Sequence, residues 1–242
     1  MASGLVEIVV DRPADAGPAL ATEPQIELAM ILDEQKRRIE GAKLYYYRPY
    51  PKQQVFHDAG ALMRERMFLA GNRVGKTECG AAETAIHMTG LYPEWWAGRR
   101  FHKAVRVWCA GVTNVTTRDI LQQKLIGPLL GQPGTGMIPR HALTSTTPAR
   151  GIAEALDMFT VKHVSGGTSI AWFKSYEQGR AKFQGAALEL VWLDEEPDDY
   201  EIYSESLTRT NETSGLVMVT MTPLLGQTKL TQRFLGAESA RL

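Results

Sequence analysis

The heptapeptide Gly71-Asn-Arg-Val-Gly-Lys-Thr77 directly follows the apolar run Met67-Phe-Leu-Ala70 and decides the fold of this chain. Gly75 allows a tight backbone turn in which successive N–H groups point at one anion. The ammonium of Lys76 can then bind the β- and γ-phosphates of a nucleotide, and the hydroxyl of Thr77 can bind Mg²⁺. The predicted nucleotide-binding residues of the loop are Gly71, Asn72, Arg73, Val74, Gly75, Lys76 and Thr77.

The segments around this loop are those of a phosphate-binding loop, or P-loop, with a strand before it and a helix after it. The usual pattern G-x-x-x-x-G-K-[ST] begins with glycine where this chain has Ala70, although Gly71 follows at once. Small and apolar residues then recur from Lys76 to Met88, which predicts a helix whose positive N-terminus faces the same anion. The sequence therefore predicts strand, loop and helix in this order.

A second predicted strand ends in acidic residues. The apolar run Leu188-Glu-Leu-Val-Trp-Leu193 leads into Asp194-Glu195-Glu196-Pro197. In enzymes of phosphoryl transfer, one acid holds the hydrated Mg²⁺ and a neighbouring group orients the attacking water. We assign the metal to Asp194, together with Thr77, and the water to Glu195. Both acids fall at the carboxyl edge of the sheet, where open α/β sheets bind ligands.

A third predicted strand, Val217-Met-Val-Thr-Met-Thr-Pro223, ends in two hydroxyl residues and a proline. Thr220 and Thr222 could touch the γ-phosphate or the attacking water and report hydrolysis to the rest of the protein. The alternative is a strand that is terminated by proline and contains threonines only because they favour β structure.

A glutamine pair lies upstream in a turn rich in tyrosine and proline, Tyr45-Tyr-Tyr-Arg-Pro-Tyr-Pro-Lys-Gln-Gln54. A glutamine amide both donates and accepts, as the edge of adenine requires. We choose Gln53 rather than Gln54 for this contact, and we expect Tyr50 to stack on the base. A polar helix start is the alternative.

Composition limits the classes of function. The 242 residues include 27 basic and 27 acidic side chains, so no global basic field attracts nucleic acid. This argues against a protein that coats DNA passively, but not against an enzyme that grips DNA through a local patch. Cys79 and Cys109 lie in apolar segments, which indicates core positions in a reduced intracellular setting. The histidines do not cluster, and no apolar stretch approaches the roughly 18 residues of a membrane span.

The rest of the chain alternates between helices and strands, which indicates a mostly parallel sheet with helices on both faces, an α/β fold. Residues 1 to about 22 are expected to form a mobile arm. The predicted domains are 1–44, the arm with an amphipathic helix, and 45–242, the P-loop domain. The expected helices are 24–39, 53–64, 114–130 with Asn114 or Thr116 as cap, and 199–209; the expected strands are 104–110, 158–164, 168–173, 188–193 and 216–220; and 131–150 is expected to be a loop or lid.

Taken together, these segments resemble the N-terminal ATPase domain of the large terminase subunit of tailed bacteriophages, the motor that packages double-stranded DNA. The resemblance covers about residues 45–236. It implies a P-loop NTPase fold of the ASCE, RecA-like type, ATP and Mg²⁺ as cofactors, and Glu195 as the catalytic glutamate. The segments that carry it are Tyr50-Pro-Lys-Gln53, Gly71-Asn-Arg-Val-Gly-Lys-Thr77, Leu190-Val-Trp-Leu-Asp-Glu-Glu196 and Thr220-Met-Thr-Pro223, with Phe183-Gln-Gly185 in support.

The resemblance implies roles for further residues. Thr220 and Thr222 match the coupling motif of the family. Arg73 matches a loop position where large terminases often carry arginine, and it could stabilise transition-state charge as a catalytic arginine finger. A surface side chain or a partner for Glu195 is the alternative for Arg73. Arg180 is a weaker candidate for a finger that acts across subunits.

The partners implied by the resemblance are double-stranded DNA, the portal protein and the small terminase subunit. A homo-pentamer on the portal and the host bacterial cytoplasm are implied as well, with no membrane. Large terminases continue into a nuclease domain, whereas this chain stops at Leu242, so we expect ATP hydrolysis and no nuclease activity. The candidate DNA contacts are Arg99, Arg100, Lys103 and Arg140. For each of them, the alternative is a side chain on a solvated face.

Two other functions stay open. A helicase of the DEAD-like kind shares these motifs, but it needs a second RecA-like domain, and its acidic motif normally continues with Ala-His where this chain has Glu196-Pro197. A non-catalytic ATP-binding assembly module would not need a water-orienting acid such as Glu195.

Overall fold

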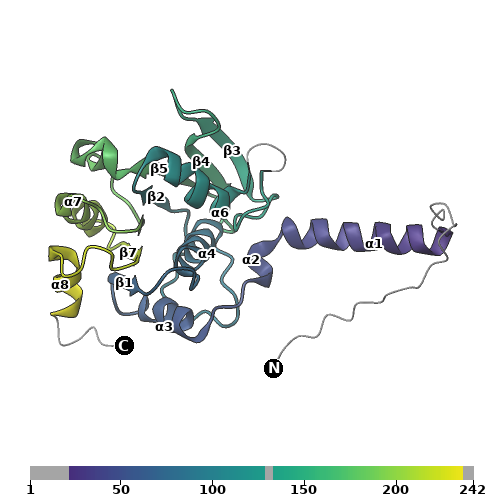
Figure 1. The fold of residues 1–242 in the computed structure, drawn as a ribbon, viewed down its shortest axis with the longest axis horizontal. Coiled ribbons are helices and arrows are strands. Elements are labelled where there is room, and N and C mark those ends of the chain that lie inside the picture. Colours follow the sequence, from purple (N-terminus) through teal and green to yellow (C-terminus); the bar gives the residue numbers. More distant parts are fainter. Residues whose placement is uncertain (1–21, 129–132, 237–242) are drawn as a thin grey trace, which may run out of the picture. The chain divides into compact units, whose positions relative to one another are not determined.

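The computed structural model describes residues 22–128 and 133–236 (Figure 1). The chain divides into two compact units, Met1–Arg38 and Ile39–Leu242. The expected first helix is present as α1 (Glu23–Glu40), and its side chains from 23 to 36 are exposed, the apolar ones included. The expected arm lies almost wholly outside the described residues, and the predicted boundary between residues 44 and 45 stays a prediction.

A seven-stranded sheet in the order β1-β7-β6-β2-β5-β4-β3 forms the centre of the second unit. Neighbouring strands from β1 across to β5 are parallel, whereas β4 pairs antiparallel with both β5 and β3. The mostly parallel sheet is therefore confirmed, with an antiparallel extension at one end. The strands are β1 (Glu65–Leu69), β2 (Arg106–Gly111), β3 (Leu143–Pro148), β4 (Leu156–Lys162), β5 (Thr168–Ser175), β6 (Leu190–Asp194) and β7 (Leu216–Met221).

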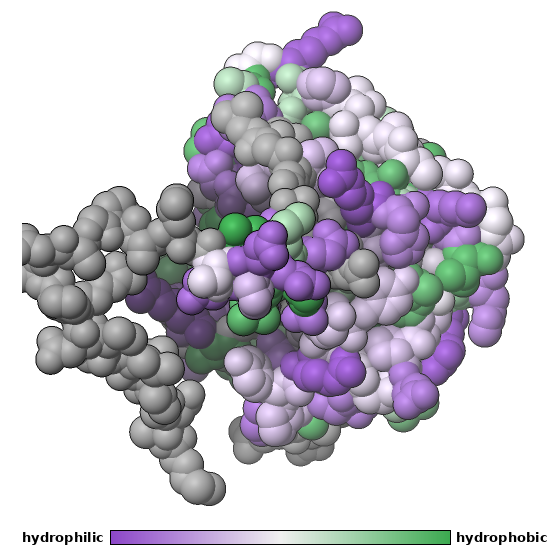
Figure 2. Space-filling view, turned by 90° about the vertical axis from the view of Figure 1, so that its right-hand side faces the viewer, coloured by the Kyte–Doolittle hydropathy of each residue, from purple (hydrophilic) through white to green (hydrophobic). Residues whose placement is uncertain are grey.

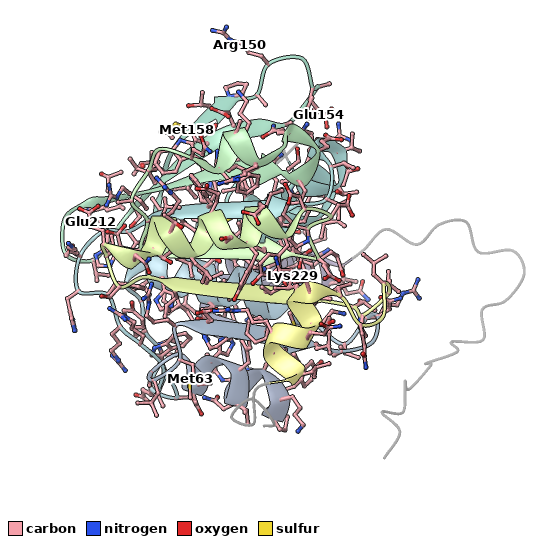
Figure 3. All side chains as sticks on the ribbon, turned by 90° about the vertical axis from the view of Figure 1, so that its left-hand side faces the viewer. Met63, Arg150, Glu154, Met158, Glu212 and Lys229 are labelled. Carbon is pink, nitrogen blue, oxygen red and sulfur yellow. The ribbon has the colours of Figure 1, made fainter. Side chains whose placement is uncertain are left out.

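Helices cover both faces of this sheet, which explains why β6 and β7 are buried along their whole length and mostly apolar. The helix α4 (Lys76–Thr89) crosses one face and contacts α2 (Lys43–Tyr46), α3 (Pro51–Ala59) and α6 (Gln123–Ile126). The other face carries α7 (Tyr200–Asn211) and α8 (Lys229–Leu235), and Figure 3 shows it with Glu212 just beyond α7 and Lys229 at the start of α8.

Each face of the sheet has its own hydrophobic core. Trp192 of β6 and Val107 of β2 pack toward α4, whereas Trp108 and Tyr203 pack on the opposite side. The two cysteines are buried and free, as expected for core residues. Short helical turns complete the unit: α5 (Asn114–Thr116), η1 (Thr117–Gln122), η2 (Tyr176–Gln178) and η3 (Arg180–Phe183).

Three predicted elements were wrong in their bounds or type. The helix expected over 53–64 is α3, which begins at Pro51 because proline suits the first helical position, and which ends before Gly60. The cap at 114 or 116 is instead Thr113, whose hydroxyl accepts the N–H of Thr116. The helical segment that follows ends at Ile126, because Gly127 has a positive φ of 91°.

The third error concerns the expected loop over 131–150, which contains β3 (Leu143–Pro148). This strand lies at the edge of the sheet and is exposed along most of its length, so it lacks the alternation of apolar residues that predicts a strand. Residues 131 and 132 of that loop lie outside the described part.

Hydrophilic residues dominate the molecular face in Figure 2, and hydrophobic residues form only small, separate groups there. Among the described residues, no helix combines the length and the apolar character that crossing a membrane requires.

Candidate functional site

The phosphate loop connects β1 to α4 at the carboxyl edge of the sheet. Gly75 caps α4 with a φ of 83°, a left-handed conformation that glycine adopts without steric cost. Arg73 also has a positive φ, 60°, and its side chain is exposed. The strand-loop-helix order predicted from the sequence is confirmed.

Lys76 is nearly buried, with 6% of its surface exposed, and it joins the loop to β7. Its ammonium donates to the carbonyl oxygen of Gly71 at 2.7 Å and to the hydroxyl of Thr222 at 2.9 Å. The Thr222 hydroxyl in turn donates to the side-chain oxygen of Asn72 at 2.9 Å. Thr222, which follows β7 directly, therefore contacts both the lysine and the Asn72 side chain of the loop.

Asp194 at the end of β6 lies beside the first turn of α4. Its carboxylate accepts from the hydroxyls of Thr77 at 3.1 Å and Thr220 at 2.6 Å. Burial raises the pKa of Asp194 to about 7, and the charge of Glu195 adds to this, while the two hydroxyls and the charge of Lys76 oppose it. Thr77, Asp194 and Thr220, far apart in the sequence, thus meet at one point.

Trp192 extends this chain of hydrogen bonds into the core. Its indole N–H donates to the Thr220 hydroxyl at 2.8 Å, which orients that hydroxyl toward Asp194. The indole lies against Gly80 of α4, where an added Cβ would come within 2.4 Å of the ring. A glycine in the second turn of α4 is therefore required for this arrangement.

Glu195 follows Asp194 with a φ of 62°, which is unusual for a residue other than glycine. Its carboxylate accepts the backbone N–H of Thr222 at 2.8 Å, and its own N–H donates to the carbonyl of Thr220 at 2.8 Å. On the other side, the hydroxyl of Tyr176 lies 3.0 Å from the carbonyl oxygens of both Asp194 and Glu195. The half-buried Glu195 side chain thus lies next to Thr222 and lines the same cavity as Lys76.

The family model described as terminase large subunit, T4likevirus-type, N-terminal, matches residues 67–235. The chain is 40% identical over 235 residues to the large terminase subunit of Salmonella phage P22, covering 89% of this chain and 47% of that protein. It is 26% identical over 248 residues to the large terminase subunit of Enterobacteria phage LP7, covering 89% and 48%.

The chain belongs to the large terminase subunits. It spans about half the length of these curated relatives. Among solved structures, the ATPase domain of the large terminase of Thermus phage P74-26 matches with a TM-score of 0.59 at 18% identity, covering 83% of this chain and 74% of that one. The family and the P-loop fold expected from the sequence are thus confirmed.

The two residues predicted to bind adenine differ in their surroundings in this terminase. Tyr50 is 68% exposed, whereas Gln53 is buried. The amide oxygen of Gln53 accepts the N–H of Tyr50 at 2.8 Å, and its amide nitrogen donates to the carbonyl of Gly75 at 2.8 Å. The amide therefore connects α3 to the phosphate loop, and the adenine contact stays a prediction.

A cavity of about 1280 Å³ opens beside the terminase P-loop. Tyr50, Gln53, residues 72–77 of the loop and Glu195 contribute to its lining, whereas Gly71 and Asp194 do not. Sequence reasoning missed further basic residues in that lining, because they come from separate elements: Lys43, Arg48, Lys52 and Lys124.

The other predicted basic residues have local partners or lie on the surface. Arg180 is about half exposed, and its guanidinium pairs with Glu205 at 2.8 Å and Glu201 at 3.6 Å. Arg99 and Arg100 lie over the rings of Phe101 and Tyr92, whereas Lys103 and Arg140 are exposed. The finger role of Arg180 and the four DNA contacts stay predictions.

Proposed function

We propose that this chain is an ATP-hydrolysing motor domain that drives the packaging of double-stranded DNA into a phage procapsid. The observation that carries the proposal is the convergence of Lys76, Thr77, Asp194 and Glu195 at one edge of the sheet. A phosphate-binding lysine, a hydroxyl and carboxylate pair, and a second acid are the parts that phosphoryl transfer requires. The Thermus phage relative, named an ATPase domain, supports the assignment through its fold.

The side chains fit Mg²⁺. This cation binds proteins through one or two carboxylates and keeps its remaining positions for water and phosphate oxygens. Asp194 supplies a buried carboxylate whose pKa burial raises, and Thr77 supplies a hydroxyl 3.1 Å away. We infer that these two residues hold the metal, which would neutralise charge on the β- and γ-phosphates.

The remaining residues then have separate tasks. Lys76 binds the phosphates, and the backbone N–H groups from Gly71 to Gly75 surround them. Glu195 orients the attacking water, because its carboxylate lines the cavity beside Lys76. Arg73, exposed at the rim of the loop, is the proposed finger, and Thr222 connects both Lys76 and Glu195 to β7.

The partners follow from the family. We infer that double-stranded DNA, the portal protein and the small terminase subunit bind this motor, that it acts as a homo-pentamer on the portal, and that it works in the host cytoplasm. Among the alternatives, a helicase is disfavoured because the chain belongs to the terminase family. A non-catalytic ATP-binding module remains the competing function that experiment must exclude.

Replacement of Glu195 by glutamine tests the proposal. In Glu195→Gln, we expect ATP turnover to fall by at least about 10²-fold, the scale of a lost base or orienting group. Binding of a fluorescent ATP analogue should remain close to that of the wild type. Glu196→Gln is the matched control, because Glu196 instead accepts from Thr228. Equal turnover in Glu195→Gln and the wild type, or a wild type that binds ATP without hydrolysing it, contradicts the proposal.

A further inference from the structure

The hydroxyl of Tyr176 lies where three backbone carbonyl groups meet. It is 3.0 Å from the carbonyl oxygens of Asp194 and Glu195 and 3.3 Å from that of Ala110. The residue is 5% exposed. We propose that Tyr176 is a positioning residue that holds Glu195 in the orientation needed to direct the attacking water. The proposal rests on the proposed function, because it assigns Tyr176 to the same reaction.

The order of the strands explains why the residue after β5 can reach the acids. In the sheet, β2 lies between β5 and β6. The last pair between β2 and β6 joins Ala110 to Leu193, so the carbonyls of Asp194 and Glu195 lie beyond the end of this ladder. Tyr176 follows β5 directly, and its side chain passes the carbonyl of Ala110, the second-last residue of β2, to reach them. A short side chain at this position could not span one intervening strand.

The backbone of Glu195 needs such support. A residue other than glycine in a left-handed conformation is strained, and this conformation persists only where its surroundings hold it. Glu195 has a φ of 62°, and its N–H group is bound to the carbonyl of Thr220 on the side of β7. Tyr176 holds its carbonyl group on the side of β2. The peptide groups on both sides of the Glu195 Cα are thus bound, which directs the side chain toward Thr222.

The tyrosine itself stands on a fixed segment. The next residue, Glu177, donates its N–H to the carbonyl of Val112 at 3.3 Å. The carboxylate of Glu177 accepts the backbone N–H of Asn114 at 2.8 Å. The phenol ring packs in the core beside Phe183, with ring centroids 6.4 Å apart. The phenol oxygen is therefore held in one place, where its single proton can be donated to the carbonyl oxygen of either acid.

Replacement by phenylalanine isolates the hydroxyl, because the ring stays. Tyr203→Phe is the matched control, since Tyr203 is also buried and its hydroxyl donates to Glu65 at 2.6 Å, away from the acids. Hydrogen exchange without added nucleotide is measured first on the whole 242-residue chain. We expect the amides of residues 194–196 to exchange faster in Tyr176→Phe than in the wild type, and not to change in Tyr203→Phe.

Steady-state kinetics provide the second readout. We expect kcat for ATP to fall about tenfold or more in Tyr176→Phe, because small misplacements of a catalytic group are costly, while KM stays within about twofold. If Tyr176 acts through Glu195, its replacement adds no further loss in the Glu195→Gln background, since the two residues serve one task. If Tyr176 had a purely structural role, Tyr176→Phe would lower kcat by the same factor in the wild-type and in the Glu195→Gln background.

Unchanged exchange at residues 194–196, or equal losses of kcat in the wild-type and Glu195→Gln backgrounds, overturns the role of Tyr176. A wild-type chain that shows no ATP turnover refutes the proposed function. The exchange experiment then still decides whether Tyr176 holds the backbone of Glu195, so the two failures are distinguishable.

Discussion

Two buried carboxylates, Glu83 in the middle of α4 and Asp194 at the end of β6, have opposite surroundings. Glu83 is fully buried and pairs with Arg66 at 2.5 Å and with His57 at 2.7 Å. Burial alone would raise its pKa, but Arg66, His57 and His87 outweigh burial, so the pKa lies well below the usual range. Asp194 has hydroxyl partners, and its pKa is raised to about 7.

We infer that this difference separates an acid that stabilises the fold from one that acts in the proposed site. Among the residues that the structure describes, no basic side chain lies within ion-pair distance of Asp194, whereas Glu83 has a cation of its own. A buried carboxylate that is paired with a basic side chain of the same protein stabilises the fold. A buried carboxylate that faces a phosphate loop and has no ion-pair partner is suited to bind a cation that arrives with the ligand.

The largest effect is expected at the structural acid. Glu83→Gln leaves the buried guanidinium of Arg66 without its counter-charge, and breaking a buried pair in this way costs about 3–5 kcal/mol. We expect the free energy of unfolding to fall by this amount in urea denaturation. Glu78→Gln is the control on the same helix, because Glu78 pairs with Lys124 near the surface, where ion pairs contribute about 0–1 kcal/mol. Equal losses of unfolding free energy in the two variants would contradict the structural role of Glu83.

The functional acid should respond in the opposite way. Asp194→Asn is expected to lower Mg²⁺-supported ATP turnover by about 10³-fold, since a bound metal ion contributes several kcal/mol of charge stabilisation. The same change removes a charge that burial disfavours, so the midpoint of thermal unfolding at pH 8 should not fall. A clear loss of thermal stability would mean that Asp194, like Glu83, serves the fold.

A smaller effect should follow from the support behind Asp194. Trp192→Phe removes the indole N–H that orients the Thr220 hydroxyl, a hydrogen bond of about 1 kcal/mol. We expect turnover to fall about fivefold. Trp108→Phe, at a buried position on the other face of the sheet, is the control. If both variants have the turnover of the wild type, the hydroxyl of Thr220 needs no support from Trp192.

The local parts of this structure could be predicted from the sequence. Gly75, Lys76 and Thr77 define their turn through adjacent residues. The runs that became β6 and β7 are mostly apolar because both of their faces are covered. The order of these segments was enough to predict that Lys76 and Asp194 meet at one edge of the sheet.

The rest depends on contacts between distant residues. His57, Arg66 and Glu83 form one cluster only after α3, β1 and α4 have packed together, and nothing in their spacing indicates it. Tyr176 reads as an ordinary residue after a strand, and its role requires the order of β5, β2 and β6. The one available indication was its place at the carboxyl end of a predicted strand, the same edge as the acids.

The ammonium of Lys76 is held by two neutral oxygens, those of the Gly71 carbonyl and the Thr222 hydroxyl. A phosphate that enters the loop replaces these oxygens as the partner of the ammonium, and the long side chain of Lys76 is already ordered. The entropic cost of fixing that side chain thus falls on folding rather than on association. We therefore expect the loop to be preorganised, with the rate of nucleotide capture set by access to the cavity and not by a search among lysine rotamers.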